Sequence, residues 1–269
     1  MAVIKNMEEN ILFLKILEER FDRFLQSYSV MSGDFMSPEQ QSQASGFFRR
    51  NRSQGAYLFG GYEEAERKMA LFLPDYTGIE TEDDILPWFS DNPDDCPLSV
   101  LDVTVPKAEN FRPGHRDYLG ALMGEGIKRE KIGDIIIRPE GAQIIVMKDI
   151  GEYLAEHLTS VGRASVTVSV KAIDTIDPGE IKKEERRYNI SSPRLDNVLS
   201  AVFNISRKSA QEAISKGLVF LDGIQQSKPD KQLAEDQKLV LRGKGKAIYR
   251  GISGTSKKGK VYITVEKYI

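Results

Sequence analysis

The spacing of apolar positions divides the chain into a helical beginning, a middle part built of strands and helices, and a mixed end. Ile11, Leu14, Phe21 and Tyr28 recur at intervals of three or seven, which predicts one amphipathic helix over residues 1–28. Similar spacing predicts helices over 38–48 and 63–73. The acidic stretch 80–95 contains two prolines and is predicted as a loop. We therefore expect residues 1–95 to form an acidic, mostly helical domain.

The middle of the chain changes to alternating, β-branched sequence. Residues 98–105 predict a strand that ends at Pro106. The following pattern predicts, in order, a helix over 116–123, strands over 134–137 and 143–147, a helix over 150–158, and a strand over 164–170. This β-α-β-β-α-β order is the ferredoxin-like arrangement, which many RNA-recognition modules share. Its strands lack the aromatic pair typical of those modules, and topology alone assigns no function. We expect an α+β protein with a ferredoxin-like, RRM-like central domain over 96–176.

The last part combines two short helices with strands. Residues 177–190 are charged and are predicted as a linker. Ser192-Pro193 predicts the start of a helix, and Ser206 and Gly217 bound a second one. Strands are predicted over 218–221, 238–241, 247–249 and 261–266. Residues 191–269 should therefore form a domain of two helices on a small sheet, with a C-terminal hairpin.

Charge is distributed unevenly along the chain. The net charge is −2, but residues 1–105 hold 9 basic against 19 acidic side chains, whereas residues 191–269 hold 15 basic against 7 acidic ones. A compact basic module is expected of a protein that binds polyanions, because each neutralised phosphate releases counterions. A solvated lysine-rich surface is the alternative that charge alone leaves open.

Other chemistry finds little support in the sequence. A single cysteine excludes an internal disulfide, and with only two histidines it cannot complete a zinc cage, so no metal or cofactor is expected. Residues 254–260 fit the spacing of a phosphate-binding loop, but Val261 replaces the magnesium-binding hydroxyl, so a hairpin loop is predicted. No apolar run is long enough to span a membrane, and a cytoplasmic location is expected.

Two sets of motifs resemble known families. Arg194-Leu195-Asp196, Ser206-Arg207 and the spacing of Ala210, Ile214 and Gly217, continued by 219–223, resemble the αL RNA-binding motif named after the fourth small-subunit ribosomal protein. Upstream, residues 115–122 and 126–134 resemble the central segment of the YlmH family. The resemblance implies a bacterial, cytoplasmic, ribosome-associated protein. It also implies roles in the rescue of stalled large subunits and in cell division.

The αL resemblance implies which residues contact RNA. Its helix pair presents a basic face to folded RNA, and phosphate contacts from such a face recognise shape rather than base sequence. The candidate contacts are Arg194, Ser206, Arg207, Lys208, Gln211, Lys216, Lys228, Lys244 and Lys246, with Lys257, Lys258 and Lys260 in the hairpin loop. A second RNA surface is predicted from Arg112, His115, Arg116, Lys128, Arg129 and Lys131. Asp196 is expected to orient Arg194 or to cap the helix.

Three functions follow from these observations. The leading one is non-catalytic binding of ribosomal RNA, or of tRNA held on the large ribosomal subunit, in the quality control of stalled translation. The second is a cell-division adaptor that recruits a protein partner through the acidic N-terminal domain. The third is RNA modification, because Arg194-Leu195-Asp196 also resembles the catalytic stretch of pseudouridine synthases. The central domain has no second copy of this triplet, which opposes the third function.

Overall fold

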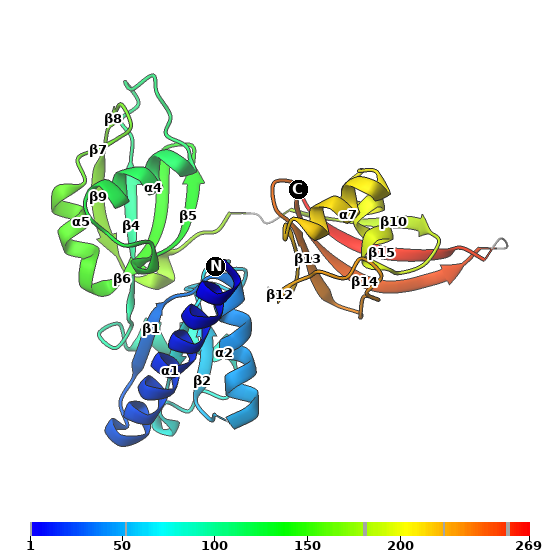
Figure 1. The fold of residues 1–269 in the computed structure, drawn as a ribbon. Coiled ribbons are helices and arrows are strands. Elements are labelled where there is room, and N and C mark those ends of the chain that lie inside the picture. The colour runs from blue at the N-terminus through cyan, green and yellow to red at the C-terminus, as the bar shows by residue number, and fades with distance from the viewer. Residues whose placement is uncertain (1, 52, 180–181, 223, 257–258) are drawn as a thin grey trace. The chain divides into compact units, whose positions relative to one another are not determined.

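The protein forms two compact units in the computed structural model, which describes residues 2–51, 53–179, 182–222, 224–256 and 259–269. We call residues 1–178 the N-terminal unit and residues 179–269 the C-terminal unit (Figure 1). Helices and sheets occur in both, which confirms the predicted α+β class.

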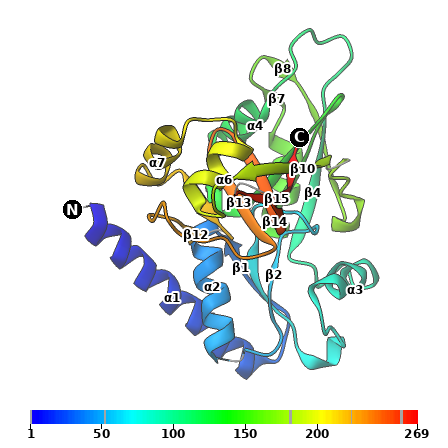
Figure 2. The ribbon, with the colours of Figure 1, turned by 90° about the vertical axis from the view of Figure 1, so that its right-hand side faces the viewer.

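The N-terminal unit begins with two helices on a three-stranded sheet. Helices α1 (Ala2–Ser27) and α2 (Pro38–Asn51) lie side by side and pack on one face of strands β1 (Met31–Phe35), β3 (Met69–Phe72) and β2 (Ala56–Phe59) (Figure 2). The helices predicted over 1–28 and 38–48 are confirmed. The helix predicted over 63–73 is wrong, because its apolar end forms the central strand β3. All four β3 residues are buried, and such a short apolar run does not distinguish a strand from a helix.

The acidic segment 80–95 is also more ordered than the predicted loop. The 3₁₀ turns η1 (Asp75–Thr77) and η2 (Glu82–Asp84) lead into helix α3 (Ile85–Asp91). The Thr81 backbone N–H donates to the Asp84 carboxylate at 2.9 Å, which stabilises the turn before the helix. Ile85 and Phe89, one helical turn apart, are completely or almost completely buried. Their burial outweighs the loop preference of the surrounding aspartates.

The rest of the N-terminal unit has the predicted ferredoxin-like topology. The elements follow in the order β4 (Leu98–Thr104), α4 (His115–Gly124), η3 (Arg129–Lys131), β5 (Ile132–Arg138), β6 (Gly141–Met147), η4 (Lys148–Ile150), α5 (Gly151–His157), the small pair β7 (Ser160–Val161) and β8 (Ala164–Ser165), β9 (Thr167–Lys171) and η5 (Ile173–Thr175). The antiparallel sheet has the strand order β5-β6-β4-β9. Helices α4 and α5 cover one face, where Tyr118 and Leu154 join Leu101 and Ile144 in one core.

The opposite face of this sheet is buried against the N-terminal sheet. Val100 and Ile145 are fully inaccessible and belong to one core cluster with Met69 and Leu71 of β3. The layers therefore run helices, sheet, sheet, helices, and the predicted boundary between residues 95 and 96 falls inside a shared core. RNA-recognition modules bind RNA on this sheet face. In this protein that face is covered by the chain's own first 95 residues.

Asp134 on β5 joins the two sheets through hydrogen bonds. Its carboxylate accepts from the Tyr62 hydroxyl at 2.8 Å and from the backbone N–H groups of Glu66 and Arg67 at 2.7 and 3.0 Å. Arg67 Nε donates in turn to the Ile132 carbonyl at 2.8 Å. These contacts satisfy polar groups that the packing of the two sheets would otherwise leave buried and unpaired.

The C-terminal unit packs two helices on one face of a six-stranded antiparallel sheet. The sheet order is β10 (Lys183–Ile190), β15 (Val261–Tyr268), β14 (Gly245–Thr255), β13 (Gln237–Leu241), β11 (Val219–Leu221) and β12 (Ile224–Gln225). Helices α6 (Leu195–Val202) and α7 (Arg207–Ser215) cover this core. The linker predicted over 177–190 is therefore wrong for its second half. Strand β10 is charged and mostly exposed, so its sequence lacks hydrophobic alternation, but it pairs with β15 along its whole length.

Two local predictions in this unit have different outcomes. Thr255 of β14 pairs with Val261 of β15, which confirms the hairpin over 254–260. Lys257 and Lys258 of that loop lie outside the described residues, and Lys260 is exposed. The helix start predicted at Ser192 is wrong, because α6 begins after its N-cap Arg194. The Ser192 hydroxyl instead accepts a hydrogen bond from Asn197 Nδ2 at 2.9 Å.

Candidate RNA-binding surface

A buried carboxylate lies at the centre of the predicted RNA-binding helices. Asp196, in the first turn of α6, has no exposed side-chain surface. Its Oδ2 accepts hydrogen bonds from Arg207 Nε at 2.9 Å and from Gln211 Nε2 at 3.2 Å. Arg194 Nε lies 3.3 Å from Oδ1. One carboxylate on α6 therefore brings together three of the predicted contact residues, two from α7 and one from the segment before α6.

The charges in this cluster leave it positive overall. Burial by itself would raise the pKa of Asp196, but the hydrogen bonds from Arg207 and Gln211 and the charges of Arg207 and Arg194 together lower the pKa below its usual value. The expected contact between Asp196 and Arg194 is present. Two guanidinium groups share one carboxylate, and their side chains remain 34% and 52% exposed. Positive charge therefore reaches the surface from fixed positions.

The start of α7 completes the surface. The Ser206 hydroxyl caps α7 by accepting from the Ser209 N–H at 3.0 Å, so Ser206 has a structural role. Lys208 follows Arg207 and is exposed, as is Lys216 at the other end of α7. We call Arg194, Arg207, Lys208 and Gln211 the helical cluster.

The remaining candidates in this unit do not all join the helical cluster. Lys228 and Lys244 are exposed in turns of the chain. Lys246 lies over the ring of Tyr268, with Nζ 5.5 Å from the ring centre. Lys238 Nζ lies 5.6 Å from the centre of the same ring. Because Lys238 precedes the core residue Leu239 in its strand, its side chain points to the opposite face. Lys238, Lys246 and Tyr268 therefore occupy the sheet face that points away from α6 and α7.

Two arginines on this outer face were not among the predicted RNA contacts. Arg187 Cζ lies over the Tyr262 ring, 4.7 Å from the ring centre. Arg242 Cζ lies over the Phe220 ring, 4.4 Å from its centre. Aromatic rings beside cations can stack with bases and attract phosphates, as in proteins that bind single strands. Each pair joins residues from distant parts of the chain, so no local motif reveals it. In paired strands, core and outer residues alternate. This alternation identifies the side chains that meet on the outer face only after the strand pairing is known.

The second predicted RNA surface does not come together as one patch. Arg112, His115 and Arg116 are exposed at the start of α4, whereas Lys128, Arg129 and Lys131 follow its end. A ten-residue helix spans about 15 Å. The two groups therefore lie at opposite ends of the helix.

The group after α4 is largely occupied by internal contacts. Arg129 Nη1 donates to the Ile132 carbonyl at 2.6 Å, and burial lowers the pKa of Arg129. Lys131 Nζ lies 3.3 Å from carboxylate oxygens of both Asp34 and Asp149. Lys128 is exposed and lies 3.9 Å from a Glu130 oxygen. Arg129 and Lys131 thus serve the fold, in contrast to the group before α4.

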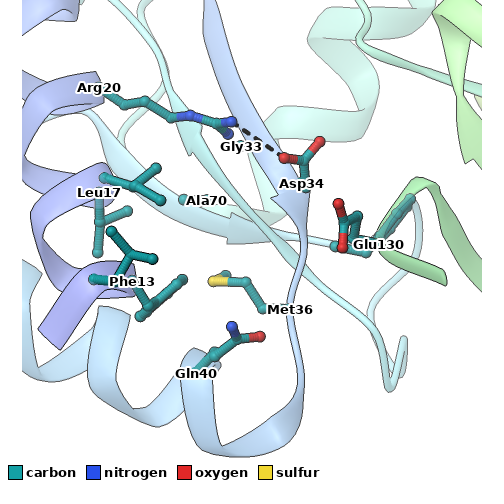
Figure 3. A pocket seen from close by; sticks show the side chains of 12 residues that line it. Phe13, Leu17, Arg20, Gly33, Asp34, Met36, Gln40, Ala70 and Glu130 are labelled. Atoms are coloured by element: carbon teal, nitrogen blue, oxygen red, sulfur yellow. Dashed lines mark hydrogen bonds and ion pairs between the residues drawn. The ribbon is translucent and has the colours of Figure 1, made fainter. Parts of the chain in front are cut away.

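The N-terminal unit also has a groove beside α1. It encloses about 290 Å³ between α1, β1 and Glu130, and Figure 3 shows Phe13, Met36 and Glu130 around it. Leu12 and Ile16 line the groove and are 58% and 42% exposed, and the charged residues Arg20, Asp34 and Glu130 line it as well. We call this the α1 groove. Within the described ranges, α1 and the other helices are too short or too polar to cross a membrane.

Two family patterns match parts of this chain. The family pattern described as "Putative RNA-binding domain in YlmH" matches residues 92–175, and the S4 domain pattern matches residues 193–239. Both families are RNA-binding rather than catalytic. A solved structure titled "Cell division protein ylmH from Streptococcus pneumoniae" covers 63% of this chain and 95% of its own, with 19% identity and a TM-score of 0.46.

A curated relative aligns over most of the chain. The "Ribosome-associated protein quality control protein P2" of Bacillus subtilis (strain 168) is 32% identical over 242 residues. The alignment covers 90% of this chain and 89% of the relative. Since the identity extends through both units, this chain belongs to the YlmH family and carries its central domain followed by an S4 domain.

Proposed function

We propose that this protein binds structured RNA of the large ribosomal subunit, either ribosomal RNA or tRNA held on that subunit, in the cytoplasm. It acts there in the quality control of stalled translation, and it acts by binding rather than by chemistry. The observation that carries the proposal is the helical cluster, in which Arg194, Arg207 and Gln211 contact the buried carboxylate of Asp196. The printed name of the 32% identical relative supports the ribosomal setting.

The geometry of the cluster suits folded RNA. Arg194 and Arg207 each use one side of the guanidinium on Asp196, which restricts their side chains before RNA arrives. A planar guanidinium fixed in this way loses less conformational freedom when it contacts a phosphate. Phosphate contacts position a protein on RNA without reading bases, so the target is defined by shape.

The same geometry opposes the enzymatic alternative. A catalytic Asp196 would have to reach a nucleotide, but its carboxylate has no exposed surface and is bonded to Arg207 and Gln211. These contacts explain Asp196 as a positioning residue. The enzymatic alternative predicts a modified nucleotide that disappears in Asp196→Asn cells, and an unchanged nucleotide profile would eliminate it.

Ribosome co-sedimentation tests the proposal. The wild type and an Arg207→Ala/Lys208→Ala variant are sedimented with ribosomes and separated subunits at several salt concentrations, and the retained RNA is sequenced. We expect salt-sensitive binding to the large subunit. The salt slope is the steepness with which the logarithm of the binding constant falls with the logarithm of the salt concentration. In the double variant it should be lower by about 1.4–1.8, the value for two lost phosphate contacts. The matched control is Arg49→Ala/Arg50→Ala, which removes two adjacent exposed arginines from α2. Equal losses in both variants, or a wild type that never sediments, would contradict the proposal.

A second candidate function rests on the α1 groove. Leu12 and Ile16 are exposed along a groove that Asp34 and Glu130 also line, in the net acidic part of the chain, and this combination suits a basic amphipathic segment of a protein partner. Deleting residues 1–95 would remove part of the shared core, so the test uses Leu12→Asp/Ile16→Asp. An adaptor would lose its cellular function while ribosome binding persists. Normal function in this variant would exclude the adaptor role of the groove.

A further inference from the structure

The outer face of the C-terminal sheet, which points away from α6 and α7, has no role in the function described so far. Side chains that alternate with core residues along β10, β13, β14 and β15 point to this face. Its strand residues include the basic Lys183, Arg187, Lys238, Lys246 and Arg250 and the acidic Glu185 and Glu266. Arg250 donates two hydrogen bonds to Glu266, at 2.9 and 3.0 Å, so this pair cancels its own charge. The remaining strand residues of the face carry a net positive charge, which attracts a polyanion.

Arg187 is held on this face by contacts on two sides. Its Cζ lies over the Tyr262 ring, 4.7 Å from the ring centre. Its Nε donates to the Ser253 hydroxyl at 3.1 Å, and its Nη2 donates to the Ser253 carbonyl at 3.0 Å. The residue is exposed, and no carboxylate of the described residues forms an ion pair with it. The guanidinium is therefore fixed in place while its charge remains available.

The backbone beside Arg187 makes room for the guanidinium. The register of β14 against β15 shifts between Ile252 and Gly254. Gly254 has a φ of 154°, and a Cβ at this position would lie only 3.3 Å from Arg187 Nη2. A side chain here would crowd the guanidinium, whereas glycine lets the main chain approach it closely. The bulged strand thus supports the position of Arg187.

A second arginine lies over an aromatic ring on the same face. Phe220 stands between the core residues Val219 and Leu221 in β11, so its side chain points outward. It is nevertheless only 6% exposed, and Arg242 Cζ lies over its ring, 4.4 Å from the ring centre. Arg242 is itself exposed, and it forms no ion pair with a carboxylate in the described part of the chain. Both arginines therefore present a guanidinium that is backed by a ring.

The distance between the two arginine–ring pairs limits what binds to both. The sheet order β15-β14-β13-β11 puts three strand intervals, about 14 Å, between the strands of Tyr262 and Phe220. A strand of several nucleotides is therefore needed to contact both pairs. Proteins that bind single strands combine aromatic rings and cations in a positive groove, with sites of about 4–16 nucleotides.

We propose that this outer face binds an unpaired segment of RNA, with one base stacked on the guanidinium of Arg187 and another on that of Arg242. A planar guanidinium stacks on a base and also attracts the neighbouring phosphates, whereas an acidic peptide would use only its charge. The inference rests on the proposed function and adds a second binding mode to it. The helical cluster takes folded RNA, and the opposite side of the sheet takes an unpaired strand.

The test measures the binding of a fluorescein-labelled oligouridylate of about 12 nucleotides to the full chain by fluorescence anisotropy. Arg187→Lys keeps the charge and removes the guanidinium plane, so the dissociation constant should rise about tenfold at an unchanged salt slope. Arg242→Lys should have the same effect. Arg187→Ala also removes the charge and should lower the salt slope by about 0.7, the value for one phosphate contact on a single strand.

Two controls separate stacking from general charge attraction. Arg186 is the exposed neighbour of Arg187, but it points to the opposite face and pairs with Glu184, so Arg186→Ala should bind the oligouridylate like the wild type. An abasic oligomer of the same length keeps the phosphates and lacks the bases. It should bind the wild type about tenfold more weakly, and Arg187→Lys should not weaken it further. Circular dichroism in urea checks that each variant is as stable as the wild type.

Ribosome co-sedimentation of the same variants and of Arg207→Ala/Lys208→Ala distinguishes this inference from the proposed function. Equal binding of the abasic and base-bearing oligomers, or an equal loss in Arg186→Ala, would mean general charge attraction and would overturn the inference. If Arg187→Lys and Arg242→Lys bind the oligouridylate normally while Arg207→Ala/Lys208→Ala loses ribosomes, the inference fails and the proposed function stands. Loss of oligouridylate binding in the two lysine variants, with binding retained in Arg207→Ala/Lys208→Ala, would support two separate RNA surfaces.

Discussion

Two basic segments of this protein differ in what their cations do. In the C-terminal unit, Arg194 and Arg207 contact the buried carboxylate of Asp196 and remain one-third to one-half exposed. In the N-terminal unit, Arg129 donates to main-chain carbonyls, and Lys131 lies between two carboxylates. Both segments are dense in basic residues in the sequence. The first presents its charge to solvent, and the second uses most of its charge inside the fold.

The difference shows what makes a basic residue available to RNA. One carboxylate shared by two arginines leaves a net positive charge, whereas two carboxylates around Lys131 cancel its charge. The count of basic residues cannot distinguish these cases, because it ignores which partners the fold supplies.

The largest effect is expected for Asp196→Asn. The change removes the carboxylate that both arginines of the helical cluster contact, and breaking a buried ion pair costs about 3 kcal/mol. The free energy of unfolding of the C-terminal unit should fall by that amount, and ribosome affinity should fall with it. Circular dichroism in urea follows both units and Trp88 fluorescence follows the N-terminal unit, so the shift should appear in the circular dichroism curve while the Trp88 curve stays unchanged. Asp230→Asn, at an exposed position in the same unit, is the control and should be neutral.

Acid should remove the contribution of the ionised Asp196 carboxylate to the free energy of unfolding. The pKa of Asp196 in the folded protein lies below its usual value of 3.8. Its contribution to stability is therefore complete above pH 3.8 and is lost as the pH falls through the folded pKa. The stability difference between wild type and Asp196→Asn should be constant at neutral pH and should shrink below pH 3.8. A difference that stays constant in acid would show that the Asp196 charge contributes nothing.

Arg129→Ala should separate stability from binding in the N-terminal unit. The change removes hydrogen bonds to the Ile132 and Gly133 carbonyls, which should cost about 1–2 kcal/mol in urea unfolding followed by Trp88. The salt slope of ribosome binding should not change. Lys128→Ala, at the exposed neighbouring position, should affect stability little. A lower salt slope for Arg129→Ala would restore Arg129 as an RNA contact.

The smallest effect is expected for Lys131→Ala. Its pairs with Asp34 and Asp149 are partly exposed, so their loss should cost about 0.5–1 kcal/mol, and less in high salt. Ribosome binding at physiological salt should remain at the wild-type level. Lys131→Met keeps the apolar stem and should separate the packing of the side chain from its charge. A binding loss larger than that of Arg207→Ala/Lys208→Ala would reverse the comparison between the two segments.

Much of the fold was predictable where local patterns agree with tertiary packing. The amphipathic spacing in 1–28, the β-branched alternation in 98–105 and the cap at Ser206 each match an observed element. Predictions failed where the deciding partner is distant. Strand β3 has an apolar run that fits a helix, and only its place between β1 and β2 makes it a strand.

The sequence by itself determined the basic C-terminal module, its helix pair and most of the residues of the helical cluster. These depend on residue type, local spacing and capping, all of which act over a few residues. The tertiary structure alone decided that Asp196 is buried, that β10 pairs with β15, and that β3 covers the central sheet. These features arise from contacts between segments distant in the chain, where burial and pairing outweigh local preference.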